Sequence, residues 1–177
     1  TGNFVKTGFT YRGALEILKV ALRYDRLWIN LRVKGGAYGC MSGFGRSGEG
    51  YLVSYRDPNL KETNDIYEGI PAYLEAFDPD ERDMTKYVIG TISNLDAPLT
   101  PSVKGSRGLS AYLSGVTEEM MQTERDQILG AAKEDIRALA AQVRAVLATG
   151  SFCVVGNEEK IEANRGMFGE VSSLTRG

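Results

Sequence analysis

The alternation of hydrophobic and polar positions predicts helices interrupted by one β-hairpin. Apolar residues recur every three or four positions over residues 14–22 and again over residues 24–33, which is helical spacing. The second run stops at Gly35-Gly36, and glycine is a common end signal for a helix. From Ala37 the period changes to two. The segment "FGRSGEG" is typical of a hairpin loop and "YLVSYRD" of a return strand.

Most of the remaining chain is predicted to be helical. Asp57-Pro58 has the pattern of an N-cap with a first-turn proline, and Pro71 should bend or interrupt the following helix. "VKGSRG" is expected to be a turn, "SFCVVGN" a short buried strand, and "EEKIEANRGMFGEVSSL" a closing helix capped by Asn157. Further apolar stripes predict helices over residues 84–95, near 109–113, from 117, and over 136–147.

Few strands among many helices indicate the fold class. We expect an α+β fold in which a mostly antiparallel sheet is packed with helices, and we expect residues 1–177 to form one domain. The opening segment "TGNFVKTGFTY" has the glycine and aromatic content of a loop or an edge strand, without a helix signal. An unpaired sheet edge there would favour pairing with another chain, so a homodimer is a further expectation.

Composition excludes several classes of function. The 177 residues are 42% hydrophobic and 25% charged, with a net charge of -2, as in an ordinary globular chain. No basic excess supports nucleic-acid binding, and no apolar run approaches the roughly 20 residues of a membrane span. Cys40 and Cys153 lie far apart in apolar or small-residue surroundings, which favours two buried free thiols over a disulfide. A reducing compartment follows, either the cytoplasm or an organelle matrix.

The chain contains no histidine. A Ser-His-Asp triad, a Cys-His dyad and the histidine-based zinc motifs are therefore excluded within it. Two cysteines cannot supply a four-ligand structural zinc site either. We expect no metal site in this chain, and any proton shuttle or metal ligand must come from elsewhere.

Arg32 and Tyr38 flank the predicted glycine hinge, and the residues alone leave two interpretations open. In the first, Arg32 complements the negative end of its helix and Tyr38 packs on a sheet face, on the same side as Cys40. In the second, both side chains face one crevice and bind an extended peptide. A guanidinium suits backbone carbonyls, and a tyrosine hydroxyl, ordinarily protonated at neutral pH, suits a developing oxyanion.

Four segments change the balance between these interpretations. "LRVKGGAYGC", "VSYRDPNL", "DMTKYVIGTISNLD" and "VKGSRGLSAYLSGVTEE" occur in this order and spacing. They resemble the C-terminal half of the presequence proteases, a branch of the insulinase/pitrilysin family of zinc peptidases. The resemblance runs from about Phe4 to about Val155, and R-x-K-G-G-A-Y-G is a specific motif.

This resemblance implies a role in a larger enzyme. In the family, two halves close around a chamber that admits short unfolded peptides, and the N-terminal half holds zinc through an H-x-x-E-H motif and a distal Glu. The C-terminal half contributes an Arg and a Tyr, which match Arg32 and Tyr38. The first would hold the substrate backbone and the second would stabilise the tetrahedral intermediate. Gly35 and Gly36 would form the hinge between them and complete the substrate-binding set.

The absence of histidine determines where the zinc ligands of such an enzyme must lie. The chain cannot hold the family's zinc, so the ligands must lie in the N-terminal zinc-bearing half, its expected partner besides the peptide substrate. The family domain begins with strands that precede Thr1, so we expect a fragment truncated at its N-terminus. The expected function is the C-terminal domain of a zinc metalloendopeptidase that is inactive alone. The alternative is a non-catalytic peptide-binding or structural subunit that pairs with a separate zinc-bearing chain.

Overall fold

One continuous helical rod forms the centre of this computed structural model, which describes residues 1–174. It consists of α1 (Ala14–Ala21) and the π-helix η2 (Leu22–Lys34). Leu22 keeps helical angles, φ -60° and ψ -42°, so the two predicted helices are joined without a break. The apolar spacing of the sequence is confirmed by burial. The rod buries Ala14, Leu15, Ile17, Leu18, Ala21, Leu22, Leu27 and Leu31.

A small antiparallel sheet covers one side of the rod. Its strands are β1 (Gly2–Asn3), β2 (Gly39–Phe44) and β3 (Glu49–Tyr55), in the order β1-β3-β2. The hairpin pairs Gly39 with Tyr55 and Phe44 with Gly50 at its two ends. The predicted hairpin and the predicted α+β class are therefore confirmed.

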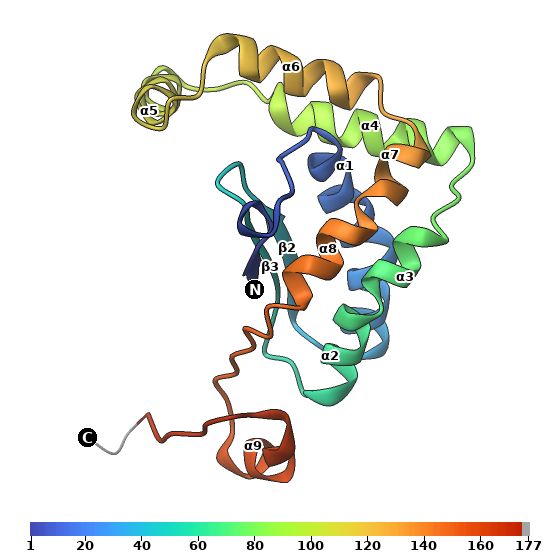
Figure 1. The fold of residues 1–177 in the computed structure, drawn as a ribbon, viewed down its shortest axis with the longest axis vertical. Coiled ribbons are helices and arrows are strands. Elements are labelled where there is room, and N and C mark those ends of the chain that lie inside the picture. Colours follow the sequence, from blue (N-terminus) through green and yellow to red (C-terminus); the bar gives the residue numbers. More distant parts are fainter. Residues whose placement is uncertain (175–177) are drawn as a thin grey trace.

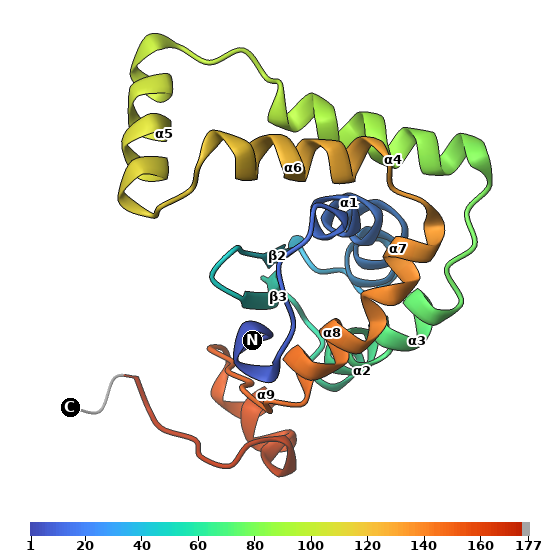
Figure 2. The same ribbon diagram turned by 45° about the horizontal axis from the view of Figure 1, so that its top comes forward.

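The other helices lie on the same side of the sheet as this rod, and the outward face of the hairpin is exposed (Figure 1). These α-helices are α2 (Lys61–Glu68), α3 (Ile70–Glu75), α4 (Glu81–Leu95), α5 (Pro101–Leu113), α6 (Glu118–Leu129), α7 (Lys133–Ala138), α8 (Ala140–Leu147) and α9 (Glu158–Ala163). Helix α3 packs on α8, α1 packs on α4 and α7, and α4 lies beside α6 at one end of the molecule. Helix α5 stands apart from this body in both ribbon views (Figure 2). Two short 3-10 turns span Val5–Thr7 and Arg165–Met167.

Several local signals act as predicted. Pro71 lies in the first turn of α3, and the helical segment is interrupted just before it, at Gly69. Side chains at four N-caps of residues 1–174 accept a hydrogen bond from the backbone N–H three residues later, which satisfies one of the free donors of each helix start. These caps are Asp80, Thr100, Thr117 and Asn157.

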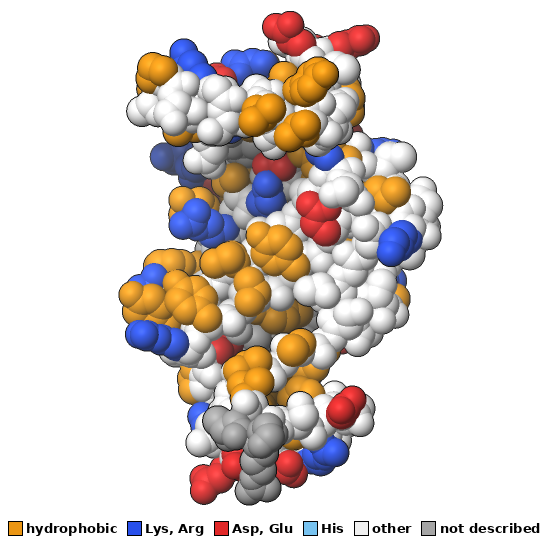
Figure 3. Space-filling view, turned by 90° about the vertical axis from the view of Figure 1, so that its left-hand side faces the viewer, with side chains coloured by type: hydrophobic (Ala, Val, Ile, Leu, Met, Phe, Trp, Pro, Cys, Tyr) orange, Lys and Arg blue, Asp and Glu red, His pale blue; other side chains and the backbone are white. Residues whose placement is uncertain are grey.

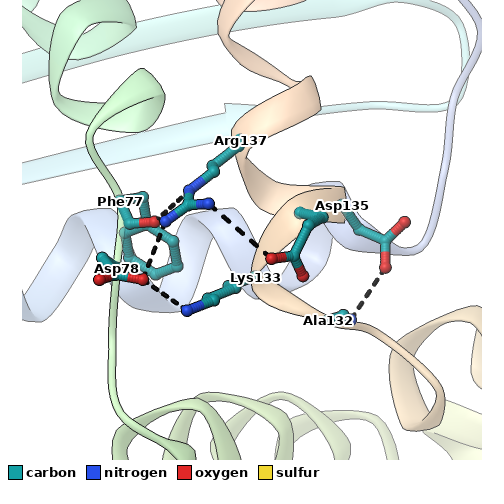
Figure 4. Close-up of polar contacts among 7 residues, drawn as sticks. Phe77, Asp78, Ala132, Lys133, Asp135 and Arg137 are labelled. Atoms are coloured by element: carbon teal, nitrogen blue, oxygen red, sulfur yellow. Dashed lines mark hydrogen bonds and ion pairs between the residues drawn. The ribbon is translucent and has the colours of Figure 1, made fainter.

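A polar cluster joins the segment after α3 to α7 (Figure 4). Arg137 donates from Nε to the Phe77 carbonyl at 2.6 Å and from a terminal nitrogen to Asp78 at 2.8 Å. The Lys133 ammonium lies 2.5 Å from the same Asp78 oxygen. The hydrogen bond and charge of Lys133, together with those of Arg137, lower the pKa of Asp78. Asp135 accepts from the Ala132 N–H at 2.8 Å and so closes the start of α7.

Two helix predictions need correction. The helix after Asp57 begins at Lys61, because the Asp57 carboxylate accepts from the Asn59 N–H at 3.0 Å and from the Thr63 hydroxyl at 2.8 Å. Asp57 therefore holds the preceding turn instead of capping the helix. The predicted turn at "VKGSRG" is wrong, since α5 runs through it behind a Thr100 cap. Each internal glycine weakens a helix by only about 1 kcal/mol, which the rest of α5 offsets.

The C-terminal predictions are only partly right. Residues of "SFCVVGN" form no strand within the part of the chain that the structure describes, and Phe152 and Val155 are exposed. The closing helix is short, because α9 ends at Ala163. Cys40 and Cys153 are both free, as predicted, but Cys40 is half-buried and Cys153 is exposed. Among the helices of residues 1–174, none is both long and apolar enough to cross a membrane.

Candidate functional site

The Gly35-Gly36 hinge turns the chain from η2 into the hairpin. The Gly36 N–H donates to the Arg32 carbonyl at 3.1 Å and the Ala37 N–H donates to the Leu31 carbonyl at 2.9 Å. Gly36 has φ +79°, so these bonds and this conformation form a Schellman-type helix end. The Asn59 side-chain amide also donates to the Gly35 carbonyl at 2.6 Å. The hinge is thus held on both sides, and it brings Arg32 and Tyr38 to one surface.

Arg32 lies exposed in the last turn of η2, among aromatic rings. Its guanidinium carbon is 4.1 Å from the centre of the Trp28 ring and 6.0 Å from that of Tyr38. Arg56 approaches the Tyr38 ring as well, at 5.3 Å. Neither Arg32 nor Arg56 forms an ion pair with another residue in the range 1–174. Two guanidinium groups that no described carboxylate neutralises therefore flank one phenol.

Tyr38 points away from the core, with 57% of its surface exposed. Its ring lies 5.5 Å from that of Tyr55 on the outward face of β3. The prediction that Tyr38 shares a face with Cys40 is therefore wrong. Tyr38 precedes the first residue of β2 in a bend, so the alternation of the strand does not reach it. Cys40 packs partly against the core. The pKa of its thiol is raised, because the effect of burial exceeds the opposing effect of the positive charges of Arg23 and Arg32.

The outward face of the hairpin continues the site as an apolar surface. Gly39 and Gly43 lie beneath the rings of Tyr55 and Tyr51, and a Cβ at either glycine would overlap the ring above it. Figure 3 shows hydrophobic side chains gathered in the middle of this side of the molecule, with basic groups at their margin. The exposed hydrophobic residues on and beside the hairpin are Tyr38, Met41, Tyr51, Val53 and Tyr55.

Sequence reasoning missed three of these neighbours. Trp28 lies four residues before Arg32, a helical spacing at which side chains contact each other, so the pair could have been found. Tyr55 and Arg56 come next to Tyr38 only through the register of the hairpin, which pairs Gly39 with Tyr55. That register depends on the turn geometry of the loop and not on any single residue.

The residues that the structure describes do not fit a zinc site. No group of three or more His, Cys, Asp or Glu side chains in residues 1–174 is arranged to hold a metal ion. The nearest thiol to the arginine–tyrosine group is Cys40, whose raised pKa disfavours the thiolate that a metal needs. The site therefore offers cations, phenols and an apolar face, but no metal ligands.

Comparison with known proteins identifies the family. The family model of the PreP C-terminal domain matches residues 1–157. This chain belongs to the PreP C-terminal domain family. Protein HypA of Clostridium perfringens is 46% identical over 175 residues, which cover 99% of this chain and 18% of that protein.

Two further relatives are named as presequence proteases. Presequence protease 1, chloroplastic/mitochondrial, of Arabidopsis thaliana is 37% identical over 163 residues, 92% of this chain and 15% of that protein. The mitochondrial presequence protease of Aspergillus oryzae is 32% identical over 146 residues, 82% of this chain and 14% of that protein. The PreP C-terminal region seen here therefore spans less than a fifth of the length of these relatives.

Proposed function

We propose that this chain is the substrate-binding C-terminal part of a presequence-protease-like peptidase that degrades short unfolded peptides. The observation that carries the proposal is the position of Arg32 and Tyr38. Both lie at the exposed margin of an apolar sheet face, and no other residue between 1 and 174 forms an ion pair with Arg32 or a hydrogen bond with the Tyr38 hydroxyl. A polar pair that the fold does not use is available to a ligand.

Arg32 would bind the substrate backbone. Its guanidinium presents several N–H donors in a fixed plane, which suits peptide carbonyl oxygens. Stacking on Trp28 at 4.1 Å orients this plane and restricts the side chain before substrate arrives. Less conformational freedom is then lost on binding, which favours affinity.

Tyr38 would stabilise the tetrahedral intermediate of peptide-bond hydrolysis. A neutral hydroxyl donates a hydrogen bond to the oxygen on which negative charge develops, and this interaction strengthens as the charge forms. Arg32 and Arg56, whose guanidinium carbons lie 6.0 and 5.3 Å from the ring centre, add positive potential at the same place. Gly35 and Gly36 contribute by setting the path between the two side chains.

The outward hairpin face would line the peptide chamber. An unfolded peptide exposes apolar side chains, and the tyrosine-rich face around Tyr51, Val53 and Tyr55 offers them a broad contact without a narrow, sequence-selective pocket. Zinc, the Lewis acid and source of the attacking hydroxide in such peptidases, would be held by residues of the N-terminal half, outside this chain. The partners would be that half and the peptide, in a reducing compartment such as the cytoplasm or an organelle matrix.

Kinetics of the longer peptidase test this assignment. In a quenched-fluorophore peptide assay, Tyr38→Phe should lower kcat by about 10²–10³ and leave KM nearly unchanged, because the lost hydrogen bond belongs to the transition state. Tyr24→Phe is the matched control, because Tyr24 is also exposed but lies on η2, outside the hairpin face, and near-wild-type turnover is expected. Arg32→Lys should raise KM as well as lower kcat, whereas Arg23→Lys on the same helix should change neither.

Thermal melting separates a functional effect from a structural one. The Tyr38 hydroxyl has no hydrogen-bond partner within the described residues, so Tyr38→Phe should change the free energy of unfolding by less than about 0.5 kcal/mol. Normal turnover in both Tyr38→Phe and Arg32→Lys would refute the proposed roles and leave the two side chains as packing elements.

A further inference from the structure

Arg56 has a backbone conformation that is unusual for a residue with a side chain. Its φ is +48°, and it is the one non-glycine residue with a positive φ among residues 1–174. In this left-handed region Cβ approaches the following carbonyl oxygen, so glycine, asparagine and aspartate are the residues that ordinarily occupy it. Strained backbone of this kind is found most often at functional sites. An arginine here costs stability that a glycine would not cost.

The neighbours of Arg56 fix the bend of the chain at this position. Strand β3 ends just before it, and the Asp57 carboxylate accepts a hydrogen bond from the Asn59 N–H at 3.0 Å. The Asn59 side-chain amide donates to the Gly35 carbonyl at 2.6 Å, so this turn is joined to the glycine hinge. The turn is therefore held by groups other than the Arg56 side chain, and a smaller residue could occupy the bend.

The exposed side chain of Arg56 lies against an aromatic ring. Its guanidinium carbon is 5.3 Å from the centre of the Tyr38 ring. Within residues 1–174, no ion pair and no second ring engages this guanidinium. Arg32 differs, because it lies closer to the Trp28 ring, at 4.1 Å, than to that of Tyr38, at 6.0 Å. Among the described side chains, the one charged or aromatic partner of Arg56 is therefore Tyr38.

Arg56 also contacts Tyr38 through the backbone. The Tyr38 N–H donates to the Arg56 carbonyl at 3.3 Å, one residue beyond the last pair of the hairpin, Gly39 with Tyr55. The carbonyl thus holds the backbone of Tyr38, and the guanidinium lies against its ring. Tyr55 borders the same ring, with 5.5 Å between the ring centres. Two contacts from Arg56 therefore restrict both the backbone and the side chain of Tyr38.

We propose that Arg56 is a positioning residue for Tyr38 in peptide-bond hydrolysis. This inference rests on the proposed function of Tyr38, and it adds that Arg56 acts through Tyr38 and not on the substrate. The guanidinium limits the rotation of the phenol and so holds the hydroxyl where the oxyanion forms. Its positive charge also stabilises the negative charge that the phenol oxygen gains when it shares its proton with the oxyanion. The strained backbone keeps the guanidinium beside this ring.

Kinetics of the longer peptidase test this role. Arg56→Met removes the charge and keeps a long side chain, and it should lower kcat about 10- to 100-fold while KM stays nearly unchanged. Arg56→Lys keeps a cation that can lie beside the ring, so it should restore part of the loss. Arg82→Met is the control for the removal of an exposed arginine. Arg82 lies on α4, outside the site, and its replacement should leave turnover unchanged.

A double variant distinguishes positioning from direct contact with the substrate. A residue that acts through the Tyr38 hydroxyl has little effect once that hydroxyl is removed. In the Tyr38→Phe background, Arg56→Met should therefore change kcat/KM by less than about twofold. If the two losses multiply instead, or if Arg56→Met raises KM in the same proportion as it lowers kcat/KM, Arg56 binds the peptide itself and the inference is overturned.

Thermal melting of the 177-residue chain tests the strained backbone separately. Arg56→Gly relieves the left-handed strain, whereas Arg56→Met retains it. Glycine also raises the entropy of the unfolded chain, which offsets part of this gain, so the glycine variant should melt about 1–4 °C higher than the methionine variant. Both variants should lose turnover in the longer peptidase. Higher stability with lower turnover in Arg56→Gly would support a residue retained for function and not for folding.

The outcomes for Tyr38 and Arg56 separate this inference from the proposed function. Normal turnover of Tyr38→Phe would refute the proposed function and this inference with it. Impaired turnover of Tyr38→Phe together with wild-type turnover of Arg56→Met would overturn the inference alone. A glycine variant at position 56 that melts below the methionine variant would also contradict it, because the backbone at Arg56 would then hold no strain.

Discussion

Replacement of Gly36 by alanine isolates the cost of the hinge conformation. Gly36 has φ +79°, which an L-residue with a side chain adopts at a cost of about 1–2 kcal/mol. A Cβ there would have Pro58 Cγ as its neighbour at 3.6 Å, an ordinary van der Waals contact, so no steric clash is added. Alanine also lowers the conformational entropy of the unfolded chain relative to glycine, which stabilises the folded state by about 0.4–1 kcal/mol. The net loss of stability should be about 1 kcal/mol.

Urea denaturation at 25 °C and thermal melting of the same protein measure this loss. For a chain of this size, 1 kcal/mol corresponds to a fall in Tm of about 2–4 °C. Gly36→Asn should lose less, because asparagine tolerates the left-handed region better than alanine. Gly105→Ala is the control with the opposite sign. Gly105 lies in the exposed helix α5, and a methyl group there would meet no atom within 4 Å beyond its own helical turn, so this change should stabilise by about 0.5–1 kcal/mol.

Two outcomes would refute the reasoning about Gly36. Wild-type stability of Gly36→Ala would show that the hinge does not need a left-handed residue. Equal and large losses, about 3 kcal/mol or more, for alanine and asparagine would show that crowding and not backbone conformation dominates. In the longer peptidase, Gly36→Ala should also reduce turnover, because the hinge sets the path from Arg32 to Tyr38.

Two further predictions concern charge and thiol reactivity. Asp78→Asn should reduce stability at neutral pH, because Lys133 and Arg137 stabilise the Asp78 carboxylate and lower its pKa in the folded protein. The stability that this carboxylate contributes is present above the unfolded carboxyl pKa of about 3.9 and is lost as the pH falls through the folded value. The difference in stability between Asp78→Asn and wild type should therefore shrink in acid denaturation series, and a constant difference would contradict the ion-pair origin. Cys153 should react faster than Cys40 with an aromatic disulfide reagent at pH 8, since Cys153 is exposed while burial raises the pKa of Cys40 and reduces its thiolate. Equal rates for single-cysteine variants would contradict this difference.

Local signals in the sequence determined the helices, because the causes of a helix lie within a few residues. The apolar period over residues 14–22 predicts the buried face of α1, and Pro71 predicts the break between α2 and α3. The caps at Asp80 and Thr117 are equally local. Helix α5 is an exception, because its glycines suggested a turn while the cap at its start and the residues between them favoured the helix.

Pairing between distant segments was decided only by the tertiary structure. "SFCVVGN" has the composition of a strand, but a strand forms only beside a partner, and within residues 1–174 the sheet ends at β1 before reaching it. The candidate site shows the same division. A specific motif in the sequence points to Arg32 and Tyr38, whereas the hinge geometry and the hairpin register place Tyr55 and Arg56 beside Tyr38. The register of a hairpin depends on the turn geometry and on the alternation of both strands together, so no single residue encodes it.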